Sequence, residues 1–145
     1  MEVVRLTNEQ IAAAVVWWTE AIRRPQFHTL ERGAPVQRGE EPVMIAEMMA
    51  TAHTPAKTDK QLGDFAAALA EILVRCNPRD ISVDYGPDPI LSEAATAAGF
   101  KPDMLAFPWK TNMWLVDGKV QVRHGYAAPV VLVYAPATQA QEAGA

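Results

Sequence analysis

The fold of this chain is decided by Phe107-Pro-Trp-Lys-Thr-Asn-Met-Trp-Leu-Val-Asp-Gly-Lys-Val-Gln-Val-Arg-His-Gly-Tyr126, a stretch that predicts a β-hairpin. Asp117-Gly118 is the turn signal, because a two-residue type I′ turn needs positive φ at both central positions. With this turn, Asn112 opposes Arg123 across the hairpin. Side chains alternate between the two faces of a strand. The apolar face, which we expect to be buried, holds Met113, Leu115, Val120 and Val122.

The opposite face of the hairpin has the chemistry of a surface that binds a nucleotide. This face holds an indole flanked by amides and two cations. Its residues are Asn112, Trp114, Lys119, Gln121 and Arg123. An indole offers a ring on which a base can stack, and cations form charge-assisted hydrogen bonds with phosphate. An ordinary solvated sheet face covered by one tryptophan explains the same pattern equally well, so the periodicity leaves both interpretations open.

Composition excludes several classes of protein. The chain has 145 residues, of which 50% are hydrophobic and 21% are charged, and this balance is typical of one globular domain. The net charge of −4 argues against a dedicated nucleic-acid binder, whose surface is basic. Between residues 104 and 134, however, Lys110, Lys119 and Arg123 outnumber the single anion, Asp117. A basic, aromatic patch on an acidic protein favours a small anionic ligand over a nucleic-acid polymer.

The single cysteine and the absence of long apolar runs indicate the compartment. Cys76 excludes an intramolecular disulfide and favours the cytoplasm. It falls on the apolar stripe of a predicted helix, so we expect a buried structural thiol. The N-terminus lacks the pattern of a signal peptide, and no apolar run approaches the length that spans a bilayer. We therefore expect a soluble protein that does not contact membranes.

Helical periodicity dominates the first half of the chain. Thr7 and Gln10 have the spacing of a capping box, and an apolar stripe follows them. Trp17 lies about 100° around the helix from Trp18, so the two side chains cannot face the same core. Trp17 should then face a second layer, a partner chain or a ligand. The expected core stripe consists of Ile11, Ala14, Val15, Trp18 and Ile22.

The remaining elements complete an α+β pattern. A long loop over 26–41 precedes a predicted helix over 42–52 and another that begins at the Thr58 cap. The latter has the apolar stripe Leu62, Phe65, Ala66, Leu69, Ile72, Leu73 and Cys76. A strand over 81–85, a helix over 89–98 and a strand over 130–134 surround the hairpin. We expect an N-terminal helical layer packed on a small, mostly antiparallel C-terminal sheet with one further helix, in a single domain over 1–135 followed by a disordered tail over 136–145.

Motifs for catalysis and for metal binding are absent. The three histidines are scattered, without a pair at ligand spacing, and there is no glycine-rich phosphate loop. We therefore expect no catalytic residues, no metal and no cofactor. One alternative stays open, in which His124 forms an acid–base pair with Asp84 or Glu93 in a small hydrolase or phosphodiesterase.

Aromatic and cationic residues also flank the hairpin. Phe107 and Trp109 precede it with Lys110, and we expect one of the two rings in the core and the other at a site. Tyr126 adds a further ring beside Arg123.

Short motifs spread over most of the chain carry a resemblance to a known family. They are Leu6-Thr-Asn-Glu-Gln10, Trp17-Trp18, Val83-Asp-Tyr-Gly-Pro87, Phe107-Pro-Trp-Lys-Thr-Asn-Met113 and Val120-Gln-Val-Arg-His-Gly-Tyr-Ala-Ala-Pro129. Together they resemble the Thoeris anti-defence sponge family of small phage proteins. The resemblance implies a protein that is not an enzyme and that acts in the cytoplasm of the bacterial host during infection. Members bind glyco-cyclic ADP-ribose signals made by host immune TIR proteins, some also bind cyclic di- or trinucleotides, and they form dimers that can assemble into hexamers.

The resemblance also implies residues of the binding site. The family's pocket uses a tryptophan of the first helix, here Trp17 or Trp18, a phenylalanine before the hairpin, here Phe107, and a late basic residue, here Arg123. Ala127 stands where glycine is usual, which restricts the backbone of the turn. The full expected set of ligand-binding residues is Trp17, Trp18, Arg24, Phe107, Trp109, Lys110, Asn112, Trp114, Arg123 and Tyr126. A structural or partner-binding phage protein, whose sheet face and Trp17 bind protein, is the other alternative.

Overall fold

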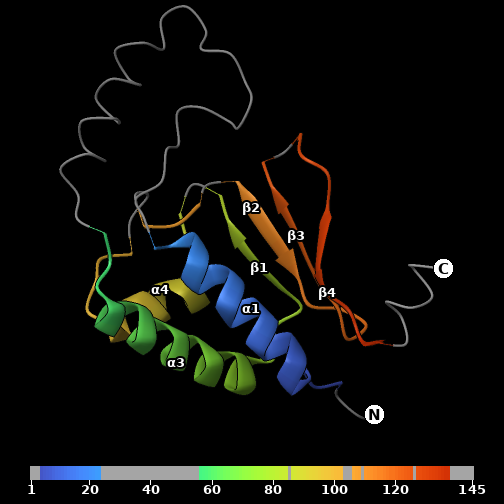
Figure 1. The fold of residues 1–145 in the computed structure, drawn as a ribbon, viewed down its shortest axis with the longest axis horizontal. Coiled ribbons are helices and arrows are strands. Elements are labelled where there is room, and N and C mark those ends of the chain that lie inside the picture. The colour runs from blue at the N-terminus through green and yellow to red at the C-terminus, as the bar shows by residue number, and fades with distance from the viewer. Residues whose placement is uncertain are drawn as a thin grey trace, which may run out of the picture.

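The computed structural model describes residues 4–23, 56–84, 86–102, 106–108, 110–125 and 127–137. Within them the strands form one antiparallel sheet in the order β1-β2-β3-β4, and the helices all lie on one side of it (Figure 1). The expected α+β architecture is confirmed. The predictions for residues 26–41, 42–52 and 138–145 lie outside the described residues. The elements are α1 (Asn8–Ala21), α3 (Asp59–Cys76), β1 (Asp80–Val83), α4 (Pro89–Ala97), β2 (Thr111–Trp114), β3 (Val120–His124) and β4 (Val131–Tyr134).

Side-chain caps determine where α1 and α3 begin. In α1 the Thr7 hydroxyl accepts from the Gln10 amide at 3.0 Å, and the Gln10 side chain accepts from the Thr7 amide at 2.8 Å. Thr58 and Gln61 repeat the same reciprocal pair at the start of α3. Each box satisfies two backbone donors that a helix leaves unpaired at its N-terminus. Both capping boxes predicted from the sequence are confirmed.

The hairpin forms with the predicted turn and register. Asp117 and Gly118 both have positive φ, 56° and 74°, and the Lys119 amide donates to the Val116 carbonyl at 2.9 Å. We call the side of the sheet that faces the helices its inner face and the opposite side its outer face. The predicted inner-face side chains of the hairpin are all buried: Met113, Leu115, Val120 and Val122.

Two contacts of α1 hold it against the inner face. The Gln10 side chain donates to the Lys119 carbonyl at 3.1 Å, which ties the start of the helix to the hairpin turn. Further along, the fully buried Trp18 directs its indole N–H at the Met113 sulfur, 3.2 Å away. Behind α1, α3 packs against both α1 and α4. One layer of helices therefore covers one face of the sheet (Figure 1).

Cys76 is exposed, so the prediction of a buried thiol is wrong. The apolar stripe of α3 is covered only as far as Leu73. Cys76 is the last residue of the helix, and Asn77 then turns the chain in the left-handed conformation with φ 48°. Periodicity predicts the direction of a side chain around the helix axis, but not whether a neighbouring element still covers the final turn.

Candidate functional site

The outer face of the sheet presents polar and aromatic side chains in two rows. Cross-strand partners point to the same side of a sheet, and neighbouring strands lie about 4.8 Å apart. The pairings Asp80–Trp114, Trp114–Gln121 and Gln121–Leu132 therefore align one row across all four strands, about 14 Å from end to end. A second row joins Ser82, Asn112 and Arg123.

Trp114 and Arg123 form the centre of this surface. The two residues lie diagonally across the hairpin, and the guanidinium carbon is 5.8 Å from the centroid of the indole. At this separation a guanidinium is attracted to the ring, by about 0.5–1 kcal/mol at a partly exposed site. Both side chains are half-buried. The pair thus presents a planar cation beside an aromatic ring, without a helix of the described chain packed above it.

Amide and carboxylate groups surround this pair. Asn112 lies directly opposite Arg123, and Gln121 lies directly opposite Trp114. Asp80 is exposed on the neighbouring strand, and Leu132 is 46% exposed on the other side. The surface therefore has an acidic end, an aromatic and cationic centre, and an apolar end.

Lys110 stands at the end of the hairpin nearest Arg123. Its backbone adopts a positive φ of 54°, and its carbonyl accepts a 2.7 Å hydrogen bond from the Gly125 amide. This bond closes the end of the β2–β3 ladder opposite the turn. Lys110 thus lies at the rim of the outer face.

The aromatic residues that the resemblance assigns to the pocket lie on the other side of the sheet. Trp18 and Phe107 are fully buried, and Phe107 packs with Phe65 and Phe100 at centroid distances of 6.2 and 6.4 Å. A base needs an exposed ring face, and neither ring has one. Trp18 and Phe107 therefore belong to the core of this chain, and their expected role in ligand binding stays a prediction.

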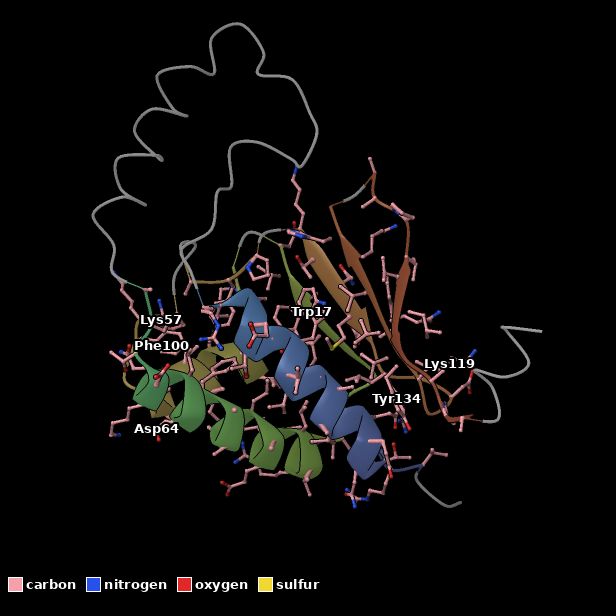
Figure 2. The ribbon with its side chains drawn as sticks, viewed as in Figure 1. Trp17, Lys57, Asp64, Phe100, Lys119 and Tyr134 are labelled. Carbon is pink, nitrogen blue, oxygen red and sulfur yellow. The ribbon has the colours of Figure 1, made fainter. Side chains whose placement is uncertain are left out.

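Trp17 occupies a second layer above the core. Its ring meets that of Trp18 edge-on, with centroids 4.9 Å apart and an interplanar angle of 84°. It is half-buried and lies between α1 and the sheet (Figure 2). The core of its own chain covers part of this ring, and the expected contact with a partner chain or a ligand stays a prediction.

The expected site is consequently divided by the sheet. Asn112, Trp114 and Arg123 point to the outer face, whereas Trp17, Trp18 and Phe107 belong to the helical side. One small ligand cannot contact both groups within a single copy of the chain. Arg24, Trp109 and Tyr126 lie outside the described residues.

Of the residues in the hydrolase alternative, His124 and Glu93 lie on different elements, β3 and α4. His124 pairs with Thr111, whose side chain is buried on the inner face, so His124 belongs to the face opposite Arg123. Glu93 is on α4, where its carboxylate forms an ion pair with Arg75 of α3. Within the described ranges, three or more metal-ligating side chains do not gather anywhere.

Three outer-face residues were absent from the sequence-based site: Asp80, Ser82 and Leu132. They come from β1 and β4, whose pairing with the hairpin depends on register over long sequence separations. The alternation of Ile81 and Val83 as apolar residues did indicate which side chains of β1 point away from the core. It did not indicate which strand they lie beside.

Comparisons with known proteins add little to this description. No protein-family model and no curated protein sequence matches the chain. Among solved structures, the BTG/Tob domain of C. elegans FOG-3, in a doubly substituted form, is similar at 22% identity, over 71% of this chain and 92% of that chain, with a TM-score of 0.46. None of the described helices is both long and apolar enough to cross a membrane.

Proposed function

We propose that this chain binds a cyclic nucleotide immune signal on the outer face of its sheet and sequesters it without cleaving it. The observation that supports binding is the Trp114–Arg123 pair on a face that none of the described helices covers. Glyco-cyclic ADP-ribose, cyclic dinucleotides and cyclic trinucleotides all combine bases with negatively charged phosphates. A ring, a cation and two amides within two rows of a sheet match that combination.

Each part of such a ligand has a partner on this surface. A base stacks on Trp114 or on the guanidinium beside it, and base stacking on an aromatic is worth about 1–3 kcal/mol. Phosphate oxygens accept charge-assisted hydrogen bonds from Arg123, which contribute about 1.5–3 kcal/mol. Asn112 and Gln121 offer both donors and acceptors to the edge of a base.

The absence of cleavage, the place of action and the assembly rest on the resemblance to the Thoeris sponge proteins. On that basis the protein acts in the cytoplasm of an infected bacterium and forms a homo-oligomer, a dimer that can assemble into a hexamer. It needs no cofactor. The alternatives are a hydrolase that uses His124 and a phage protein that binds another protein.

A retention and heat-release experiment separates these three functions. The purified chain is incubated with glyco-cyclic ADP-ribose, cyclic ADP-ribose or cyclic di- and trinucleotides, washed, and then denatured by heat. Chromatography of the released material should recover the ligand chemically intact. Recovery of cleavage products would identify an enzyme, and no retention of any ligand would favour the protein-binding alternative.

A further inference from the structure

The two edges of the sheet differ in what lies beside them. At the β1 edge the chain folds back on itself, because Val83 bridges to Pro87 and the Ser82 carbonyl accepts from the Asp88 amide at 3.0 Å. Arg79, Asp80 and Asp84 add charges along this edge. Closure by the chain and charged side chains are both means by which proteins protect an edge strand from pairing with another strand.

Within the described residues, the β4 edge has neither form of protection. In the part of the chain that the structure describes, β4 pairs only with β3, so its other edge has no strand beside it. Residues 127–137 contain no charged side chain. Val130, Val131 and Leu132 are 50%, 57% and 46% exposed, and they are three consecutive large apolar residues.

The chemistry of this edge indicates its partner. A free strand edge presents backbone donors and acceptors spaced for another strand, and its apolar side chains favour an apolar strand. The β1 edge of another copy is charged and is closed at its Val83 end, which disfavours a head-to-tail arrangement. β4 itself is uncharged, and Pro129 and Pro136 flank it without interrupting it, so an antiparallel copy of β4 matches it in length and chemistry.

We propose that two copies of this chain associate through β4, antiparallel across a two-fold axis, so that one sheet continues through both. Such an interface uses the same surface on each copy and closes after two copies. It covers Val131 and Leu132 with the apolar strand of the second copy and joins the two outer faces side by side. This interface rests on the homo-oligomer included in the proposed function, for which it supplies the contact surface. The nucleotide takes no part in the pairing of the two strands.

The stripe of α1 that contains Ala13 and Trp17 is the other surface on which the sequence allows a contact between copies. Both side chains pack partly against the core of their own chain. This stripe therefore has less free surface than the β4 edge, where Val130, Val131 and Leu132 are all exposed.

The first test compares two valine-to-lysine variants by light scattering coupled to size-exclusion chromatography, without added nucleotide. Val131→Lys changes β4, and Val74→Lys changes a valine of similar exposure, 60%, on α3. The wild type should have the mass of a dimer or a multiple of it. Val131→Lys should raise the dissociation constant at least about tenfold, because each copy then carries a charge within the apolar edge that pairs, whereas Val74→Lys should behave as wild type.

Three results would overturn the proposal. They are a wild type that stays monomeric across the micromolar range, a Val131→Lys variant that keeps the wild-type dissociation constant, and equal loss of assembly in Val131→Lys and Val74→Lys. Binding of nucleotide by a monomer would reject this interface and leave the proposed ligand in place. A dimer that binds no nucleotide would support this interface and reject the proposed ligand.

Disulfide trapping provides a second test that does not depend on a destabilising charge. In a Cys76→Ser background, single cysteines are introduced at positions 130–133, and mild oxidation is followed by a non-reducing gel. Antiparallel pairing about a two-fold axis brings at least one of these positions close to its own equivalent, so at least one variant should form a covalent dimer. Val74→Cys is the control. Failure of all four to cross-link more than this control would contradict the proposed pairing.

Discussion

Trp18 and Trp114 carry the same indole and lie on opposite sides of one sheet. Trp18 is fully buried and directs its N–H at Met113, the residue immediately before Trp114 on the chain. Trp114 is half-buried and packs against a guanidinium. The difference shows that the role of an aromatic residue here depends on which side of the sheet it lies. Adjacent residues of β2, Met113 and Trp114, likewise belong to the core and to the candidate site.

Replacing each tryptophan in turn should show the largest difference between the two sides of the sheet. Trp18→Ala should lower the free energy of unfolding by about 3–5 kcal/mol, because it leaves a cavity between α1 and the sheet. Trp114→Ala should cost about 1 kcal/mol or less, since its ring remains partly in solvent. Urea denaturation followed by far-ultraviolet circular dichroism measures both values. Equal losses in the two variants would contradict the assignment of the two faces.

Arg123→Ala tests the outer face for binding. Loss of a charge-assisted hydrogen bond should weaken binding of the retained cyclic nucleotide by roughly ten- to a hundredfold. The free energy of unfolding should change by less than about 1 kcal/mol, because only the contact with Trp114 is lost. Isothermal titration calorimetry gives the affinity. Arg75→Ala, which removes an exposed arginine of α3, is the matched control and should bind as wild type.

Gly118→Ala tests the turn that sets the two faces. Gly118 has φ +74°, and a Cβ at this position would lie 3.1 Å from the Pro136 Cγ. An L-residue in this conformation costs about 1–2 kcal/mol, so the variant should be less stable by at least that amount. Gly63→Ala is the control, because it lies in α3 with no atom within 4 Å of the added Cβ. It should be more stable by about 1 kcal/mol, and a loss of stability in both variants would argue against the turn as the cause.

Thr7→Ala tests the cap of the helix that covers the inner face. The variant loses the acceptor for the Gln10 amide and should be destabilised by about 1 kcal/mol. Thr96→Ala, near the end of α4, removes a hydroxyl that bonds only to the Ser92 carbonyl of its own helix. This control should change the free energy of unfolding by less than about 0.5 kcal/mol. Thermal or urea unfolding distinguishes the two, and a Thr7→Ala variant as stable as this control would show that the capping box contributes little.

Local signals in the sequence predicted the hairpin and the beginnings of the helices. Positive φ at Asp117 and Gly118, and the two capping boxes, depend only on residues within a few positions of one another. Alternation then predicted which side chains of the hairpin are buried, because a two-residue turn determines the register of both strands. These predictions are confirmed for all of the hairpin residues concerned.

The sequence could not predict which of the candidate residues share a surface. Trp17 and Phe107 were assigned to the binding site by the resemblance, and Trp114 was assigned to it by the alternation of the hairpin. Packing against the helices puts the first two on the inner side and leaves the third on the outer face. Exposure of Cys76 was missed for a related reason, since it depends on where α3 extends past its neighbours.

The sequence by itself determined the α+β pattern, the hairpin and its two chemically different faces, because these follow from turn geometry, capping and side-chain alternation over short distances. Only the tertiary structure decided that β1 and β4 extend the outer face with Asp80, Ser82 and Leu132, and that the β1 edge is closed while β4 has no strand on its outer side within the described ranges. Strand neighbours and edges depend on contacts between residues far apart in the chain, and such contacts leave no local pattern from which they can be predicted.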